Sequence, residues 1–183
     1  MIVGRNKKRF GMKKRIIILS GLLGVMVSLA APSANAADPK ELGTFGKWSA
    51  YVFTEDGNKV CYMASEPDKH EGNYTRRDKI YALVTHRPAE GTKNVFSYIT
   101  GYPYKAGSDA TVKVGSRTYT LFTQDETAWA PDAATDNQVI ESIRKGSTMV
   151  VRGVSKRGTQ TTDTFSLSGS AAAHDAISKE CGI

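Results

Sequence analysis

The sequence predicts a mainly β domain with antiparallel strands, arranged as a β-sandwich or, alternatively, as a partly open β-barrel. Short runs of β-favouring residues alternate with turn residues about every ten positions, which is typical of hairpin-connected strands. Asp-Gly and Gly-Ser pairs separate some of these runs and favour tight hairpin turns. Only two stretches, near 136–145 and near 170–180, are instead expected to be helical.

The first predicted hairpin joins the runs 48–53 and 59–64. The residues Glu-Asp-Gly-Asn at 55–58 lie between them and supply the turn. Successive side chains of a strand point to opposite faces, so Cys61 is expected to face one side of the sheet. The polar, charged stretch 65–78 follows and is predicted to be an exposed loop.

The later strands are predicted from the same punctuation by glycine, proline and charged turn residues. These predicted strands are 80–85, 95–100, 111–114, 117–123, 148–155 and 161–168. Gly115-Ser116 forms the turn of the second predicted hairpin. The segment 156–160 forms the turn of the third.

Two segments are predicted to be helices. The segment 136–145 has Asp136 as a candidate N-cap, an apolar face at helical spacing and a stop at Gly146. The alanine-rich segment 170–180 favours a second helix, which would end directly before Cys181.

Residues 1–36 have the layout of a secretory signal peptide. Basic residues come first, an apolar run over 16–31 follows, and the small residues at 34–36 match an A-x-A cleavage site. The apolar run is shorter than the roughly 20 residues that a membrane span needs. We therefore expect cleavage between Ala36 and Ala37 and no transmembrane anchor after cleavage.

Removal of this segment changes the charge of the protein. The full chain has 25 Lys+Arg and 18 Asp+Glu, a formal net charge of +7. Seven of the basic residues and none of the acidic ones precede Ala37, so residues 37–183 carry almost no net charge. We therefore expect no binding of nucleic acid. The length of 37–183 predicts a single β-rich domain with one core.

Both cysteines, Cys61 and Cys181, lie in the part that remains after cleavage. An even number of cysteines in an exported chain predicts one disulfide, here between an early strand and the C-terminus. Two buried free thiols are the alternative. The sequence has no C-x-x-C motif, which disfavours a thioredoxin-like redox role.

No pattern in the sequence identifies a catalytic, metal or cofactor site. The three histidines lack metal-ligand spacing, and no G-x-S-x-G, P-loop or dinucleotide-binding motif occurs. We therefore assign no catalytic residue, no metal ligand and no cofactor. An enzyme with an unfamiliar site stays open as an alternative, with His86, Arg87 and Asp163 as the first residues to mutate.

Five residues are candidates for contact with a partner or ligand. Tyr102 and Tyr104 belong to a Gly-Tyr-Pro-Tyr segment, Trp129 is a further aromatic, and Lys156 and Arg157 lie at the third predicted hairpin turn. The two tyrosines and the two basic residues also have a purely structural interpretation. Tyrosines often cover a sheet edge, and charged turn residues keep an edge soluble.

Several short motifs occur in order along the chain and carry a family resemblance. They are Thr44-Phe45-Gly46-Lys47-Trp48, Lys59-Val60-Cys61-Tyr62, Val84-Thr85-His86-Arg87-Pro88, Gly101-Tyr102-Pro103-Tyr104, Ala128-Trp129, Arg144-Lys145-Gly146 with Met149-Val150-Val151, and Arg157-Gly158-Thr159 with Asp163-Thr164-Phe165-Ser166-Leu167. With them the chain resembles the invasion-associated locus B family of alphaproteobacteria. The resemblance implies an exported, single-domain β protein from a family in which some members have a role in host-cell invasion. It implies no known catalytic residue, cofactor or ligand.

These observations favour a non-enzymatic exported protein that binds an envelope or host macromolecule. We expect it in the periplasm, with secretion or association with the outer surface as alternatives. A small-ligand or glycan-binding module that uses Tyr102, Tyr104 and Trp129 is the second hypothesis, and an enzyme is the third. No oligomeric state is predicted.

Overall fold

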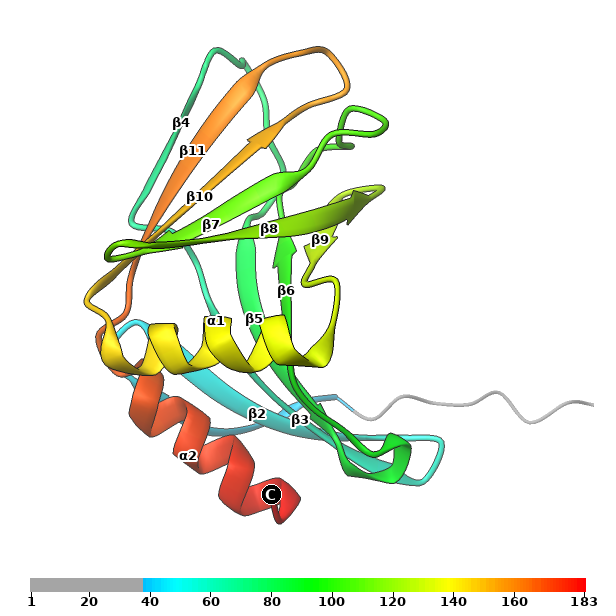
Figure 1. Ribbon diagram of the computed structural model, residues 1–183. Helices are drawn as coiled ribbons and strands as arrows, with labels where there is room; N and C mark the ends of the chain where they lie inside the picture. Colours follow the sequence, from blue (N-terminus) through cyan, green and yellow to red (C-terminus); the bar gives the residue numbers. More distant parts are fainter. Residues whose placement is uncertain (1–37) are drawn as a thin grey trace, which may run out of the picture. The chain divides into compact units, whose positions relative to one another are not determined.

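A computed structural model describes residues 38–183 (Figure 1), which form a single 11-stranded antiparallel sheet and two helices. The strands are β1 (Lys40–Phe45), β2 (Trp48–Glu55), β3 (Asn58–Ser65), β4 (Lys69–Gly72), β5 (Tyr81–Arg87), β6 (Thr92–Ile99), β7 (Ala110–Val114), β8 (Arg117–Gln124), β9 (Thr127–Trp129), β10 (Thr148–Val154) and β11 (Gln160–Ser166). The helices are α1 (Ala133–Lys145) and α2 (Ser170–Cys181), and a short 3-10 turn, η1, covers Pro88–Glu90.

The sheet bends so that its two halves face one another (Figure 1). The strand order is β1-β2-β3-β5-β6-β9-β8-β7-β10-β11-β4, and β8 pairs with both β9 and β7. The rings of Tyr98 in β6 and Phe165 in β11 meet across the interior with their centres 6.1 Å apart. Within residues 38–183 the edge strands β1 and β4 do not pair, so the sheet is not closed into a barrel. The predicted mainly β, antiparallel fold is confirmed, and its two packed layers are halves of one sheet.

The core fills the space between the two halves and beneath the helices. Trp48, Met63, Phe96 and Phe165 are fully buried there. Helix α1 packs against β6, β7 and β8, whereas α2 packs against β1, β2, β3 and β5. Burial of this apolar surface is the main source of stability for such a fold.

A disulfide joins Cys61 in β3 to Cys181 at the end of α2, with their Cα atoms 6.1 Å apart. The predicted pairing is therefore confirmed, and the bond attaches the C-terminal helix to the sheet. Within residues 38–183, neither helix combines the length and hydrophobicity needed to cross a membrane. The predicted signal peptide and the cleavage site between Ala36 and Ala37 lie outside the described residues.

The three predicted hairpins are confirmed. They could be predicted because each turn depends on the chemistry of a few neighbouring residues. Asp56 and Gly57 connect β2 to β3 with positive φ angles of 49° and 79°, a conformation that favours Asp-Gly. Gly115, with φ 58°, lies in the turn between β7 and β8. The turn between β10 and β11 likewise falls where the sequence predicts it.

The first helix begins earlier than predicted, and Asp136 is not its N-cap. Asp132 is the N-cap instead, because its carboxylate accepts a hydrogen bond from the Thr135 N–H at 2.7 Å. Asp136 lies in the first turn, is buried, and accepts the Phe96 N–H at 2.8 Å. Asp136 therefore connects α1 to β6 rather than capping the helix.

The stretch 65–78 is not simply the exposed loop that its composition predicts. It contains β4, which pairs with β11 at the edge of the sheet and has exposed side chains throughout. It also contains Arg77, whose side chain is only 4% exposed. An edge strand of polar residues has no alternating apolar pattern, so its sequence resembles that of a loop.

Candidate functional site

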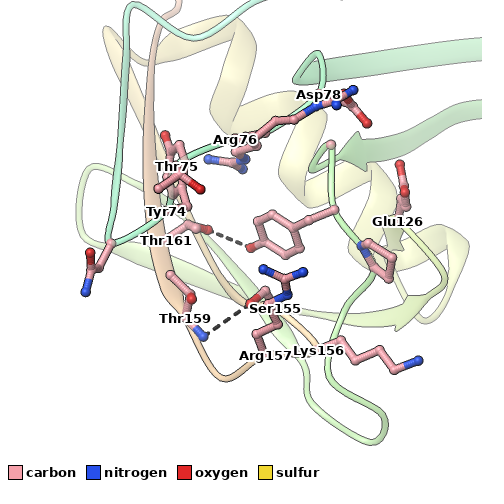
Figure 2. A pocket seen from close by; sticks show the side chains of 15 residues that line it. Tyr74, Thr75, Arg76, Asp78, Glu126, Ser155, Lys156, Arg157, Thr159 and Thr161 are labelled. Carbon is pink, nitrogen blue, oxygen red and sulfur yellow. Dashed lines mark hydrogen bonds and ion pairs between the residues drawn. The ribbon is translucent and has the colours of Figure 1, made fainter.

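A cleft of about 560 Å³ opens where three connecting segments converge (Figure 2). These segments are residues 73–78 after β4, Gly101–Pro103 after β6, and the 155–159 turn between β10 and β11; Glu126 of the β8–β9 turn and Thr161 of β11 complete the lining. The lining consists of charged, hydroxyl-bearing and tyrosine side chains together with Asn73, Gly101 and Pro103. No alanine, valine, leucine, isoleucine, methionine or phenylalanine is among these described lining residues.

Two glycines allow the segments around the cleft to approach closely. Gly101 has a φ of +72°, and a Cβ atom at this position would lie 2.3 Å from the Asp78 carbonyl oxygen. The Asp78 N–H donates to the Gly101 carbonyl at 3.0 Å and ties the two segments together. Gly153 in β10 leaves room for tyrosines, since a Cβ there would lie 2.9 Å from the Tyr102 hydroxyl. The Gly-Tyr-Pro-Tyr segment thus needs its glycine for close packing.

Arg77 forms the floor of the cleft and is held there by a buried ion pair with Asp163, which is not itself among the lining residues. Two nitrogens of the guanidinium group contact the two carboxylate oxygens, each at 2.7 Å, and the side chains are 4% and 1% exposed. Arg77 Nε also donates to the Thr100 carbonyl at 2.6 Å, and the Tyr98 hydroxyl donates to the Asp163 carboxylate. Such bidentate geometry with further hydrogen bonds is what a buried charge pair requires.

The environment keeps the groups of this cluster in defined protonation states. Burial disfavours the charged form of Arg77, but the hydrogen bonds and charges of Asp163, Tyr98 and Tyr74 together outweigh this effect, so the pKa of Arg77 lies above its ordinary value. Burial, followed by the nearby Asp163 charge, raises the pKa of Tyr98. Arg77 is therefore a permanent cation and Tyr98 a permanent hydrogen-bond donor.

Tyrosine rings surround the Arg77 guanidinium group. Its central carbon lies 4.9 Å from the centre of the Tyr102 ring and 5.6 Å from that of Tyr74, which is cation–π distance. The Tyr102 hydroxyl hydrogen-bonds the Thr161 hydroxyl at 2.6 Å, as the dashed line from Thr161 in Figure 2 marks. The Tyr102 ring is thus fixed in orientation at the cleft wall.

The rim of the cleft carries two basic side chains, Lys156 and Arg157, on an anchored turn. The Lys156 N–H donates to the Pro103 carbonyl at 2.8 Å, and the Gly158 N–H donates to Ser155 at 2.7 Å. Both basic side chains are exposed, and within residues 38–183 neither forms an ion pair. The backbone is therefore held in place while the two charges face solvent.

The five contact candidates from the sequence separate into three groups. Tyr102, Lys156 and Arg157 line the cleft together. Tyr104 is 7% exposed and packs edge-on against Tyr102 with ring centres 5.6 Å apart, so it supports the cleft from behind and does not present its ring. Trp129 is not part of the lining and instead stacks on Phe122, with ring centres 5.7 Å apart.

Arg77, Tyr74 and Thr161 are cleft residues that sequence reasoning missed. Arg77 and Tyr74 belong to the stretch predicted as a loop, and Thr161 looks like any residue of a strand. The one available indication was the charged run Thr-Arg-Arg-Asp at 75–78, followed directly by a β-favouring run. Nothing local in that run distinguishes the buried arginine from the exposed one.

The three residues named for an enzymatic role lie in separate environments. Asp163 is paired with Arg77, and Arg87 pairs with Glu55 and, at 3.3 Å, with Glu90. His86 is fully buried beneath α2. The structure does not bring these three side chains into one site.

His86 hydrogen-bonds Ser178, but in an orientation that does not activate the serine hydroxyl as a nucleophile. Its Nδ1 accepts the Asn94 N–H at 3.0 Å, which assigns the ring proton to Nε2. Nε2 then donates to the Ser178 hydroxyl at 3.2 Å, whereas a general base would have to accept the serine proton. Burial also lowers the pKa of His86. Within residues 38–183, no cluster of three or more His, Cys, Asp or Glu side chains is placed to hold a metal ion.

Comparisons with known proteins place this fold and sequence in a family. The family model described as invasion associated locus B (IalB) protein matches residues 48–178. The crystal structure of invasion associated protein B from Bartonella henselae has a similar fold, with a TM-score of 0.51 and 15% sequence identity. The likeness covers 75% of this chain and 95% of that one. No curated protein matches the chain.

Proposed function

The chain belongs to the invasion associated locus B family, and we propose that it is an exported, non-enzymatic protein that binds a macromolecular partner at the cleft. The partner is a component of the envelope or of a host cell. Membership of this family relates the chain to invasion-associated proteins. The single observation that carries the proposal is the rigid, charged rim of the cleft.

The hydrogen bonds of the cleft favour binding because its loops and side chains are already held in place before a partner docks. The Lys156 backbone is attached to Pro103, and Tyr102 is held by Thr161 and by the Arg77 guanidinium group. A preorganised surface loses less conformational entropy on association than a mobile one does. Aromatic and arginine side chains also contribute disproportionately to binding energy at protein surfaces.

The hydrogen bonding of the cleft floor supports a binding role rather than a catalytic one. Both Asp163 oxygens accept bonds from Arg77, and one accepts a further bond from Tyr98. The Tyr102 and Thr161 hydroxyls bond each other. Groups engaged in this way hold the architecture of the cleft and are poorly placed to take up a proton from a substrate.

Export is supported by the predicted signal peptide at residues 1–36 and by the disulfide. A disulfide that attaches the last helix to the sheet persists in an oxidising compartment. We propose the periplasm as the site of action, with secretion or outer-surface association as alternatives.

The test is affinity capture from an envelope extract with three forms of the tagged full-length protein. They are the wild type, the cleft variant Lys156→Gln with Arg157→Gln, and a control variant, Lys113→Gln with Arg117→Gln. The control removes the same charge from exposed positions beside another hairpin turn.

We expect a stoichiometric partner that wild type and control retain and that the cleft variant loses. Binding of the purified partner to purified protein then confirms a direct contact. A partner retained equally by all three forms would place the contact elsewhere on the molecule. Capture without any partner would contradict the proposed function.

A further inference from the structure

The chemistry of the cleft lining distinguishes between classes of ligand. Pockets for apolar small molecules are lined mainly by aliphatic and aromatic carbon, and extended peptides need side pockets for alternate side chains. The described lining has no aliphatic hydrocarbon side chain apart from the Pro103 ring. Its hydroxyl groups, including those of Thr75 and Thr159, and the amide of Asn73 match a ligand that is itself rich in hydroxyl groups.

The balance of charge around the cleft favours an anionic ligand. Arg77 is neutralised by Asp163, and Arg76 lies 3.6 Å from the Asp78 carboxylate. The lining charges outside these two ion pairs are the cations Lys156 and Arg157 and the single carboxylate of Glu126, so positive charge is in excess. The planar guanidinium group of an arginine such as Arg157 matches the two oxygens of a carboxylate.

The Tyr102 ring adds a surface of suitable shape. Its hydroxyl is fixed by Thr161 and its π system is polarised by Arg77, so the ring keeps one orientation. A tyrosine combines a flat apolar face with a polar edge. A sugar ring likewise combines an apolar face of C–H groups with polar hydroxyls at its edge.

We propose that the cleft binds an acidic saccharide, namely a segment of a polysaccharide that carries carboxylate groups on its sugar rings. Lys156 and Arg157 contact the carboxylates, Tyr102 packs against a sugar face, and the threonine hydroxyls bond sugar hydroxyls. The inference rests on the proposed function, because the saccharide is the recognised part of the macromolecular partner.

The test measures the affinity of the purified full-chain protein by titration calorimetry with defined oligosaccharides and matched controls. Oligogalacturonate supplies sugar rings with carboxylates, dextran oligomers supply neutral sugars, and poly-L-glutamate supplies carboxylates without sugars. We expect oligogalacturonate to bind at least about tenfold more tightly than either control, because charge-assisted bonds and ring contact are both required. Added salt weakens the binding, since it screens the rim charges.

Variants locate the binding within the molecule. Lys156→Gln with Arg157→Gln is expected to weaken oligogalacturonate binding at least about tenfold, because each side chain loses a charge-assisted contact. The control Lys113→Gln with Arg117→Gln, which removes the same net charge, leaves the affinity unchanged. Tyr102→Leu is also expected to weaken binding, and thermal unfolding of each variant verifies that the fold is intact.

Several outcomes would overturn the saccharide inference. If poly-L-glutamate binds as tightly as oligogalacturonate, charge alone is recognised. If dextran binds as tightly as oligogalacturonate, the carboxylates do not contribute to recognition. An equal loss in the cleft and control variants would show a general charge effect, and absence of oligogalacturonate binding would reject the ligand class. If the captured partner is still lost in the cleft variant while saccharides fail to bind, this inference fails and the proposed function stands.

Discussion

At the scale of single residues, burial rather than residue type decides what each charge does. Arg76 and Arg77 are neighbours in the sequence, yet the side chain of Arg76 is 87% exposed and that of Arg77 is 4% exposed. Arg77 is buried because Asp163, Tyr98 and the Thr100 carbonyl together satisfy its guanidinium group. Such a pair is weak evidence for net stability, because the cost of removing two charges from water offsets much of their attraction, whereas loss of one partner leaves a buried charge uncompensated.

Asp163→Asn tests the role of the buried pair. The substitution leaves the Arg77 cation buried without its counter-charge, so we expect the free energy of unfolding to fall by about 3–5 kcal/mol. Asp175→Asn is the matched control, because the ion pair of Asp175 with Arg144 is exposed and its loss should cost less than about 1 kcal/mol. Urea unfolding of both variants gives the comparison. Equal small losses would mean that solvent reaches Arg77 in solution.

Arg157→Ala tests the opposite case, an exposed charge to which the proposed function assigns a role in binding. The side chain is exposed and, within the described part of the chain, takes part in no ion pair. We expect the free energy of unfolding to change by less than about 0.5 kcal/mol, as for ordinary surface substitutions. Thermal and urea unfolding measure this change. A loss of several kcal/mol would assign Arg157 a structural role instead.

At the scale of elements, polar side chains on the buried faces of the helices determine how they dock. Asp136 of α1 accepts the Phe96 N–H of β6, and His174 of α2 contacts Asn94 at 2.8 Å and Arg144 at 3.2 Å. Ser170 donates to the Ile143 carbonyl at 2.9 Å and joins the two helices. Asp136, Ser170 and His174 each have a hydrogen-bond partner, so the helices pack in one register.

The pH dependence of stability provides a test of Asp136. Burial raises its pKa from 3.8 to about 6, so the folded protein binds this proton more tightly than the unfolded chain does. Its contribution is therefore complete below pH 3.8 and is lost as the pH rises through about 6. Asp136→Asn removes the titrating group, so the free energy of unfolding of the variant relative to wild type should be about 3 kcal/mol higher at pH 8 than at pH 3.5.

Urea unfolding of wild type and Asp136→Asn across this pH range measures the effect. His174 has the opposite trend, because burial and the Arg144 charge lower its pKa to about 4 and its contribution falls as the pH drops from 6.5. His174→Gln in the same series separates the two contributions. A constant difference between wild type and Asp136→Asn at every pH would reject the linkage.

At the scale of the whole molecule, a bent sheet and one disulfide combine distant parts of the chain. The sheet brings β6 against β11, and the disulfide closes a loop of 120 residues from β3 to α2. The core contains large fully buried side chains from both halves, such as Phe96 and Phe165. The fold therefore has a hydrophobic core of its own in addition to the covalent link.

Cys61→Ala with Cys181→Ala tests how much the disulfide adds. We expect the double variant to fold with a β-rich circular dichroism spectrum but to lose about 2–4 kcal/mol, because the bond restricts the unfolded chain. Helix α2 should lose hydrogen-exchange protection first, since the bond is the covalent link that holds its C-terminal end to β3. Thiol titration of denatured, non-reduced wild type should show no free thiol. Two thiols in protein taken directly from the envelope would refute the bond in the cell.

Export predicts a defined mature N-terminus. The small residues at 34–36 precede the cleavage site, so mass spectrometry of the envelope-soluble fraction should detect a chain that begins at Ala37. Recovery of chains that begin at Met1 or Met12 from the cytoplasm as the main species would contradict the predicted compartment.

The sequence by itself determined the features that depend on neighbouring residues. Turn chemistry at Asp56-Gly57 and Gly115 placed hairpins, alternation of side chains placed strands, and an even cysteine count in an exported chain paired Cys61 with Cys181. These features arise within a few residues or from simple counting, so no knowledge of the folded chain was needed to predict them.

Only the tertiary structure decided which polar residues meet. Arg77 and Asp163 are 86 positions apart, and they pair because the sheet bends until the segment after β4 lies against β11. The same bend brings Tyr102 and Thr161 to one cleft, buries Tyr104 and leaves Trp129 outside the lining. Burial turns two ordinary charges into a fixed floor for the cleft, and burial is a property of the folded chain rather than of any local pattern.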